Sequence, residues 1–172
     1  MRKSFLIVLI TLFISCSLGK KKNDQDNDGT KGKSDLAIAI PAGGNSWVVN
    51  DTAQNHKMIT DKGIHNWTDT KSVIRTYFKT NTMGKIFIGL NTKTSTGKSK
   101  IKVSLGTTTK EFEVSNTDYE QIMVGTFDIA EPGYHYIEIQ GLEKNGDVFA
   151  DIDKFLIGGP ATKGEITFVK DD

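Results

Sequence analysis

The residues with the widest chemical range lie close together in one polar stretch, residues 51–71 (DTAQNHKMITDKGIHNWTDTK). This stretch holds two of the three histidines, His56 and His65, and one of the two tryptophans, Trp67. Its apolar residues follow neither the helical nor the strand period. Because long irregular loops are uncommon in compact domains and usually serve a function, we predict that residues 51–71 form a binding loop.

The residue types in and near this stretch favour a sugar ligand. A sugar ring has an apolar C–H face, which packs on a flat aromatic ring, and a polar edge, which needs amide, carboxylate or guanidinium partners. These groups are available from His65, Asn66, Trp67, Asp69 and, further along the chain, Arg75. We therefore predict that Trp67 is the stacking platform for a carbohydrate and that the other four residues form hydrogen bonds to it.

Alternative roles stay open for several of these side chains. Trp67 can instead plug one end of the core while Asp69 caps a turn through its side-chain oxygen, since most tryptophans are largely buried. For the same reason we predict that Trp47, in a strand-like stretch, lies in the core. Arg75 and Tyr77 share one face of a predicted strand and either extend a binding surface or form a solvated edge.

No enzymatic motif accompanies these residues. The chain lacks a G-x-S-x-G elbow, an H-E-x-x-H zinc motif and a glycine-rich phosphate loop. Its histidines lack helical metal spacing, and no third ligand stands beside His56 and His65. We predict a protein that is not an enzyme and has no cofactor. The competing hypothesis of a small hydrolase would need two carboxylates, or a histidine and a carboxylate, in one pocket.

Two acidic patterns are compatible with calcium. Residues 24–35 (DQDNDGTKGKSD) match the oxygen ladder and glycine of a calcium-binding loop. Lys31 replaces the usual apolar anchor, however, and no helix-forming sequence flanks the loop, so we interpret this match as coincidental. Asp151, Asp153 and Phe155 share one face of a predicted strand, where the carboxylates need hydrogen-bond partners or a structural calcium ion.

The N-terminal residues have the features of an export signal. Arg2 and Lys3 precede ten largely apolar residues, 5–14 (FLIVLITLFI). Ten helical residues span about 15 Å, roughly half the hydrocarbon thickness of a bilayer. We therefore predict a signal peptide at residues 1–15 and not a transmembrane anchor.

The only cysteine, Cys16, directly follows this segment. The arrangement resembles a bacterial lipoprotein signal and predicts that Cys16 is acylated, with residues 16–35 as a flexible polar tether. The alternative is an ordinary secreted protein with an incidental cysteine. The lipoprotein interpretation places the protein in the bacterial cell envelope, anchored by lipid to a membrane, which we expect to be the outer membrane.

The rest of the chain, residues 36–172, is predicted to be one all-β domain. Side chains alternate along many short runs, as where Ile101, Val103 and Leu105 share one face. Turn sequences such as Pro132-Gly133 separate these runs. A net charge of +1 gives no basic surface for nucleic acid. We expect an antiparallel β-sandwich of the jelly-roll type, with strands near 36–40, 46–50, 73–80, 85–90, 100–105, 110–114, 121–127, 134–140, 148–157 and 165–169.

Several short motifs recur in a characteristic order over about residues 36–160: Gly44-Asn45-x-Trp47, Gly63-Ile64-x-x-Trp67, Tyr77-Phe78, Gly84-x-Ile86, Pro132-Gly133-Tyr134, Phe149-Ala150-Asp151 and Gly158-Gly159. In this order they resemble the bacterial domain of unknown function 5077 family. The resemblance implies a jelly roll similar to galactose-binding-like domains and carbohydrate-binding modules. We find no counterpart to the acidic pair that often opens such modules.

The sequence thus favours a non-catalytic, lipid-anchored module that binds carbohydrate. The alternative is a protein-interaction or structural lipoprotein of the envelope. That alternative predicts an exposed apolar patch on one sheet face.

Overall fold

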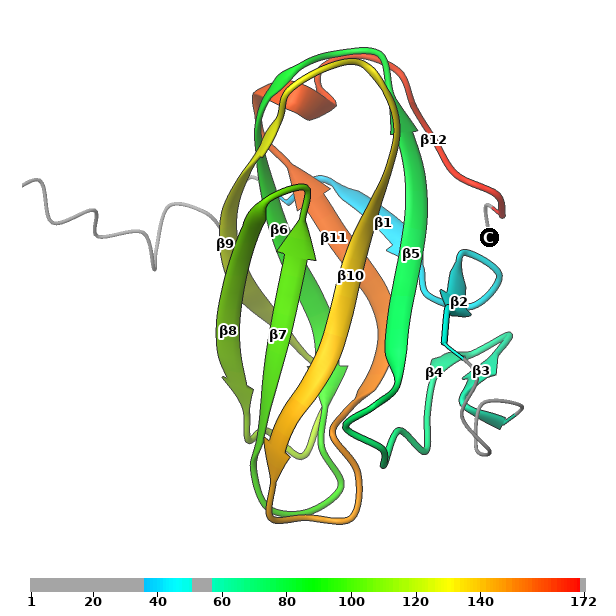
Figure 1. The fold of residues 1–172 in the computed structure, drawn as a ribbon, viewed down its shortest axis with the longest axis vertical. Coiled ribbons are helices and arrows are strands. Elements are labelled where there is room, and N and C mark those ends of the chain that lie inside the picture. The colour runs from blue at the N-terminus through cyan, green and yellow to red at the C-terminus, as the bar shows by residue number, and fades with distance from the viewer. Residues whose placement is uncertain (1–35, 51–56, 171–172) are drawn as a thin grey trace, which may run out of the picture.

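Two six-stranded antiparallel sheets pack face to face around one hydrophobic core (Figure 1). The computed structural model describes residues 36–50 and 57–170. The predicted signal peptide, Cys16, the tether, the calcium-loop-like stretch and His56 lie outside the described residues. The predicted class, an all-β antiparallel sandwich, is confirmed for the described part of the chain.

The first sheet has the order β3-β4-β11-β6-β9, and β1 also pairs with β11. Its strands are β1 (Ile38–Pro41), β3 (Ile59–Thr60), β4 (Gly63–Ile64), β6 (Gly84–Lys93), β9 (Glu120–Ile129) and β11 (Asp151–Gly158). The second sheet has the order β12-β5-β10-β7-β8, and β2 also pairs with β5. Its strands are β2 (Ser46–Val48), β5 (Val73–Thr80), β7 (Ser99–Leu105), β8 (Thr108–Val114), β10 (Gly133–Lys144) and β12 (Ile166–Thr167). A 3₁₀ helix, Pro160–Thr162, follows β11.

Strands β7 and β10 bury the faces that the alternation of their side chains predicts. Ile101 and Val103 of β7 are fully buried, and so are Ile137 and Ile139 of β10. Glu138, which lies between Ile137 and Ile139 on β10, faces outward. This agreement follows from the two-residue side-chain period of a strand, which fixes every face once one side is buried.

The stretch predicted to be one irregular loop contains a small hairpin, β3 and β4. Ile59 pairs with Ile64, and Ile64 pairs with Ile152 of β11, so the hairpin extends the first sheet. A two-residue strand is too short to show periodicity, which explains why the sequence did not indicate it. At Gly63 (φ 119°) a Cβ atom would lie 2.2 Å from the Ile152 carbonyl oxygen, so this contact requires glycine.

Beyond the 3₁₀ helix, the chain runs along the outer edge of β5 (Figure 1). We call residues 163–170 the strap. One end is held by β12, where Ile166 pairs with Thr80. The other end is held by the buried side chain of Asn45, whose Nδ2 donates to the carbonyl oxygens of Pro41 (3.0 Å) and Lys170 (2.7 Å). Asn45 Oδ1 accepts from the Lys170 backbone N–H at 2.9 Å. The strap is therefore tied to the sandwich at two separate points.

Replacing Asn45 with alanine should lower the free energy of unfolding by about 1–3 kcal/mol, because the part-buried backbone groups of Pro41 and Lys170 lose the hydrogen bonds that the buried Asn45 side chain provides. Asn45→Asp should destabilise at least as much, since a carboxylate cannot donate to the two carbonyl oxygens. Urea unfolding followed by circular dichroism measures both values. If both variants unfold at the wild-type urea midpoint, the hydrogen bonds of Asn45 to Pro41 and Lys170 do not stabilise the fold.

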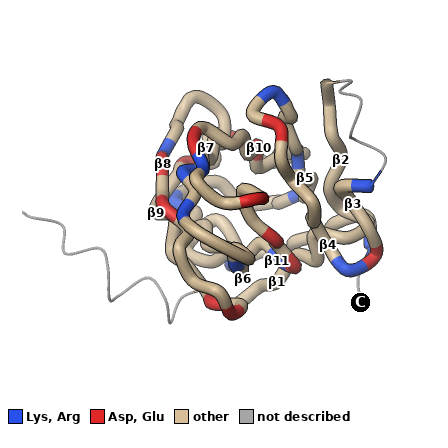
Figure 2. Tube along the Cα trace, turned by 90° about the horizontal axis from the view of Figure 1, so that it is seen from below, with Lys and Arg blue, Asp and Glu red and all other residues tan. Residues whose placement is uncertain are grey.

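Basic and acidic residues are interspersed over the sandwich (Figure 2). Several form exposed pairs across neighbouring strands, such as Lys100 with Glu111 and Lys85 with Asp128. Exposed pairs of this kind contribute little to stability. The distribution agrees with a net charge near zero and gives the described surface no face of a single sign.

Candidate ligand-binding surface

Trp67 belongs to the core. Its side chain is 0% exposed, and its ring centroid lies 5.2 Å from that of Phe149. The indole Nε1 donates to the Asp69 carbonyl oxygen at 3.2 Å. An indole enclosed in this way has no free face for a sugar, so the prediction that Trp67 is a stacking platform is wrong. The alternative interpretation, a tryptophan that packs into the sandwich, agrees with the structure.

The other predicted ligands of this stretch serve local structure. Asp69 Oδ1 accepts from the Lys71 backbone N–H at 2.8 Å and so caps a turn. Asn66 is exposed and has a positive φ of 51°, a conformation that asparagine tolerates better than most residues. His65 Nδ1 lies 3.4 Å from Asp151 Oδ1. The structure does not gather these side chains around an exposed aromatic ring.

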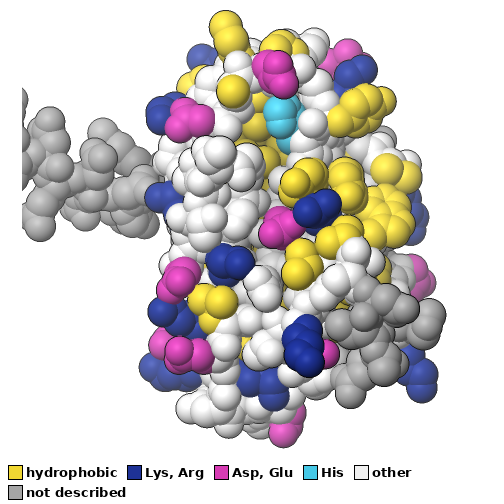
Figure 3. All heavy atoms as spheres, viewed as in Figure 1, with side chains coloured by type: hydrophobic (Ala, Val, Ile, Leu, Met, Phe, Trp, Pro, Cys, Tyr) yellow, Lys and Arg dark blue, Asp and Glu magenta, His cyan; other side chains and the backbone are white. Residues whose placement is uncertain are grey.

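An exposed cluster of aromatic rings lies instead on the outer face of the second sheet. Trp47 of β2 is 43% exposed, and its ring centroid lies 5.5 Å from that of Tyr77 on β5. Tyr77 lies 5.7 Å from Tyr136 of β10, which is 38% exposed. Figure 3 shows hydrophobic side chains gathered over β5 and β10 on this face, with basic and acidic side chains beside them.

The prediction that Trp47 lies in the core is therefore wrong. β2 is a three-residue strand whose register with β5 pairs Ser46 with Thr76. Both hydroxyl groups are buried and lie 2.8 Å apart, so the faces of Ser46 and Thr76 are turned inward. Because side chains alternate along a strand, the neighbouring Trp47 must point outward.

A fixed pair of charged groups lies beside these rings. Arg75 Nε donates to Glu138 Oε2 at 2.9 Å, and Arg75 Cζ lies 4.2 Å from the centroid of the Tyr136 ring. The hydrogen bond to Glu138 is the main cause that raises the pKa of Arg75 above its ordinary value. The guanidinium is thus charged and held in place. Of the predicted ligands, Arg75 is the one that lies among exposed aromatic rings.

We call Trp47, Arg75, Tyr77, Tyr136 and Glu138 the aromatic surface. Strand register explains its assembly, since Arg75 pairs with both Trp47 and Glu138, and Tyr77 pairs with Tyr136. The sequence carries a partial signal, because alternation along residues 134–139 places Tyr136 and Glu138 on the face opposite to the apolar Ile137 and Ile139. It did not reveal which strand lies beside β10.

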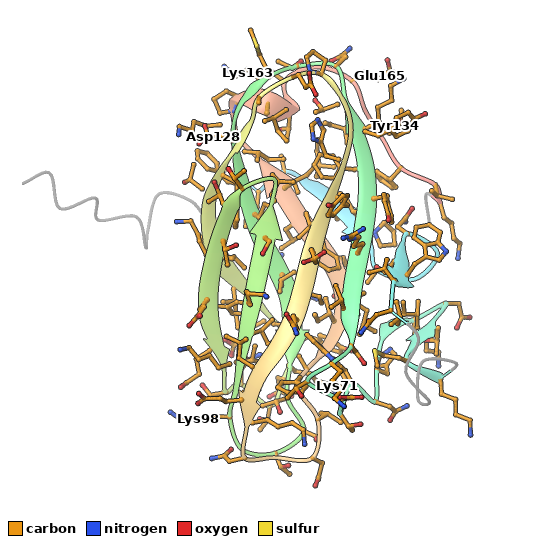
Figure 4. The ribbon with its side chains drawn as sticks, viewed as in Figure 1. Lys71, Lys98, Asp128, Tyr134, Lys163 and Glu165 are labelled. Carbon is orange, nitrogen blue, oxygen red and sulfur yellow. The ribbon has the colours of Figure 1, made fainter. Side chains whose placement is uncertain are left out.

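A groove of about 210 Å³ continues from the aromatic surface toward the strap. We call it the strap groove. Its sheet side is formed by Tyr77 and Phe78, Lys79 and Tyr134, and its outer side by residues 167–169. Tyr134 lies next to the strap (Figure 4). Tyr77 belongs both to the groove and to the aromatic surface, so the two are continuous.

The two aspartates of β11 lie elsewhere, on the first sheet. A bulge between Ile152 and Lys154 shifts the alternation, so Phe155 is buried while both aspartates stay partly exposed. The prediction that Phe155 shares their face is therefore wrong. Asp153 Oδ1 accepts from Asn91 Nδ2 at 2.8 Å. Within residues 36–50 and 57–170, no group of three or more His, Cys, Asp or Glu side chains is arranged to hold a metal ion.

The described part of the chain also has no helix of the length and apolar character that a membrane span requires.

The sandwich is similar to solved carbohydrate-binding modules. A family 35 carbohydrate-binding module from an environmental isolate is 16% identical, with a TM-score of 0.53, and the match covers 77% of this chain and 95% of that chain. A family 35 module from Clostridium thermocellum is 11% identical, with a TM-score of 0.54 and coverage of 72% and 99%. The CBM35 from Cellvibrio japonicus Abf62 is 11% identical, with a TM-score of 0.52 and coverage of 78% and 99%. At these identities the likeness shows the fold.

Some matched structures are much longer. The match covers 70% of this chain and 27% of the Podospora anserina GH26-CBM35 β-(1,4)-mannanase, to which the chain is 16% identical with a TM-score of 0.51. The structures that it covers nearly completely are carbohydrate-binding modules. No curated protein matches the sequence. Residues 40–162 match the family described as "Domain of unknown function (DUF5077)", and since this match spans most of the chain, the protein belongs to that family.

Proposed function

We propose that the protein is a non-catalytic carbohydrate-binding module whose ligand lies on the aromatic surface. The observation that carries this proposal is the contact row of Trp47, Tyr77 and Tyr136 on an open sheet face, with the Arg75–Glu138 pair at its side. The similarity in fold to solved carbohydrate-binding modules supports it.

The surface combines the two kinds of group that a sugar ring needs. Aromatic rings offer large apolar area at a low cost in conformational entropy. The guanidinium of Arg75 has five N–H donors, more than its bond to Glu138 uses, and the Glu138 carboxylate has further acceptor sites. Because the two charged groups neutralise and orient each other, ligand hydroxyl groups meet fixed donors and acceptors.

Affinity gel electrophoresis tests this proposal. The protein is run through gels that contain galactomannan, arabinoxylan, mixed-linkage β-glucan, pectic galactan or the polysaccharides of a bacterial envelope. We expect at least one of them to slow migration. If none slows the protein, and none changes its fluorescence, the proposed function is wrong.

Tryptophan fluorescence adds a local readout, because one of the two tryptophans is exposed and the other is buried. A sugar that covers Trp47 should shift the emission to shorter wavelength, whereas Trp67 is already shielded from water. In Trp47→Phe this shift should disappear while the emission of Trp67 is retained. A shift that persists in Trp47→Phe would place the ligand away from the aromatic surface.

We further propose that the module is held at a membrane of the bacterial envelope through acylated Cys16. The apolar run followed by a single cysteine and a polar stretch supports this arrangement. In cells that process lipoproteins, the wild-type chain should partition into the detergent phase of Triton X-114, and Cys16→Ala should move to the aqueous phase. Detergent partitioning that does not depend on Cys16 would contradict acylation.

A protein-interaction module is the second candidate, since an exposed apolar patch on a sheet face also suits a protein partner. The two functions differ in what Trp47→Ala disrupts. A protein-interaction module would lose one co-purifying envelope protein in this variant, and no polysaccharide would slow the wild-type chain. The charged pair placed among the rings favours a ligand rich in hydroxyl groups, so we rank carbohydrate first.

A further inference from the structure

The strap groove has a wall that is built into the fold. Residues 167–169 form this wall, and they lie between the pairing of β12 with β5 and the hydrogen bonds that join Lys170 to Asn45. At the start of the strap, the Glu165 backbone N–H also donates to Asn81 Oδ1 at 2.9 Å. Both ends of this wall are therefore tied to the sandwich by hydrogen bonds.

The lining of the groove exposes apolar groups from β10 and from the strap. Tyr134 is 81% exposed, and its ring lies 5.4 Å from Lys79 Nζ. Val169 on the opposite side is also strongly exposed. A flat ring that faces an apolar wall suits the C–H face of a sugar, and the ammonium and hydroxyl groups nearby suit its polar edge.

The size of the groove indicates that it holds only part of a ligand. Pockets that enclose a whole drug-sized molecule have volumes of about 300–1,000 Å³. The strap groove, with about 210 Å³, is smaller. It also shares Tyr77 with the aromatic surface, so a ligand that lies on Tyr77 can continue into it.

The spacing on β10 supports such a continuous path. Tyr134 and Tyr136 point to the same side of the strand, and residues two apart lie about 6–7 Å from each other along it. The outer wall of the groove, moreover, comes from the strap, which lies beyond residues 40–162 that match the family.

We propose that the strap groove is a second subsite for the same glycan, so that the protein binds a linear oligosaccharide chain of several units and not a single sugar. This inference rests on the proposed function. A chain that lies across Trp47, Tyr77 and Tyr136 places its next units between Tyr134 and the strap.

Calorimetric titration with oligosaccharides of increasing length tests the second subsite. The probes are fragments, from disaccharide to hexasaccharide, of whichever tested polysaccharide slows the wild-type chain. We expect affinity to rise with length, and Tyr134→Ala to weaken hexasaccharide binding about tenfold, as for the loss of one aromatic contact. The same variant should leave disaccharide binding unchanged. Val169→Asp should repeat this pattern, because it places a carboxylate on the apolar wall.

Tyr119→Ala is the matched control, since Tyr119 is an exposed tyrosine that lies outside the groove and the aromatic surface. It should bind every probe as the wild type does. If affinity does not depend on length, or if Tyr134→Ala behaves like Tyr119→Ala, the second subsite is wrong while the proposed function stands. If no tested polysaccharide slows the wild-type chain or changes its fluorescence, both proposals fail.

Discussion

Replacing Trp67 with alanine is expected to lower the free energy of unfolding by about 3–5 kcal/mol. Trp67 heads the fully buried side chains by volume, and its loss leaves a cavity against Phe149. The variant also removes the hydrogen bond from the indole to the Asp69 carbonyl oxygen. Urea unfolding followed by circular dichroism at neutral pH measures the change.

Trp47→Ala is the control for this experiment. Its indole is 43% exposed and contacts Tyr77 at the sheet surface, so its removal should change stability by less than about 1 kcal/mol. Trp67→Phe should fall between wild type and alanine, because phenylalanine refills part of the cavity. A Trp67→Ala variant that unfolds like the wild type and loses sugar binding would return the stacking role to Trp67.

Trp47→Ala is expected to weaken polysaccharide binding at least tenfold. Tryptophan offers the largest flat apolar area on this face, and truncation of a central aromatic contact commonly costs about 2 kcal/mol of binding free energy. The expected change is in affinity alone, because the fold does not depend on this ring. Affinity electrophoresis and calorimetric titration with the polysaccharide that slows the wild-type chain measure this change in affinity.

Two further variants distinguish the contribution of the Trp47 ring from that of the charged groups beside it. Trp47→Tyr should retain part of the affinity, since a smaller ring still offers a flat face. Arg75→Lys should also weaken binding, because lysine keeps the charge but loses the planar donor array that Glu138 and Tyr136 hold in place. Wild-type affinity in both Trp47→Ala and Arg75→Lys would exclude the aromatic surface as the site.

Together the two tryptophans form a reciprocal test. Trp67→Ala should affect stability, and a folded Trp67→Ala protein below its unfolding transition should still bind. Trp47→Ala should affect binding and leave stability nearly unchanged. The opposite pattern would mean that the roles of the two side chains are reversed.

The local interpretation of the long strands held on β7 and β10, whereas on β11 a bulge shifts the alternation and the prediction failed. Strand alternation needs only one buried face, so the core positions Ile137 and Ile139 also identified Tyr136 and Glu138 as outward. The same rule placed Arg75 and Tyr77 on one face of their strand. The site was missed where elements are short, since β2, β3 and β4 have two or three residues each.

Residue types and their alternation were enough to predict the all-β class and the buried faces of β7 and β10, and the order of short motifs was enough to recognise the family. Which of the two tryptophans is exposed to solvent could be seen only once the chain was folded. The reason is that β2 has too few residues to establish a period, so its face depends on the distant Thr76, which holds Ser46 inward. Trp67 likewise depends on Phe149, more than eighty positions away, for its enclosure. Burial at such positions depends on residues that are distant in sequence and meet only in the folded protein. A local sequence pattern therefore cannot predict it.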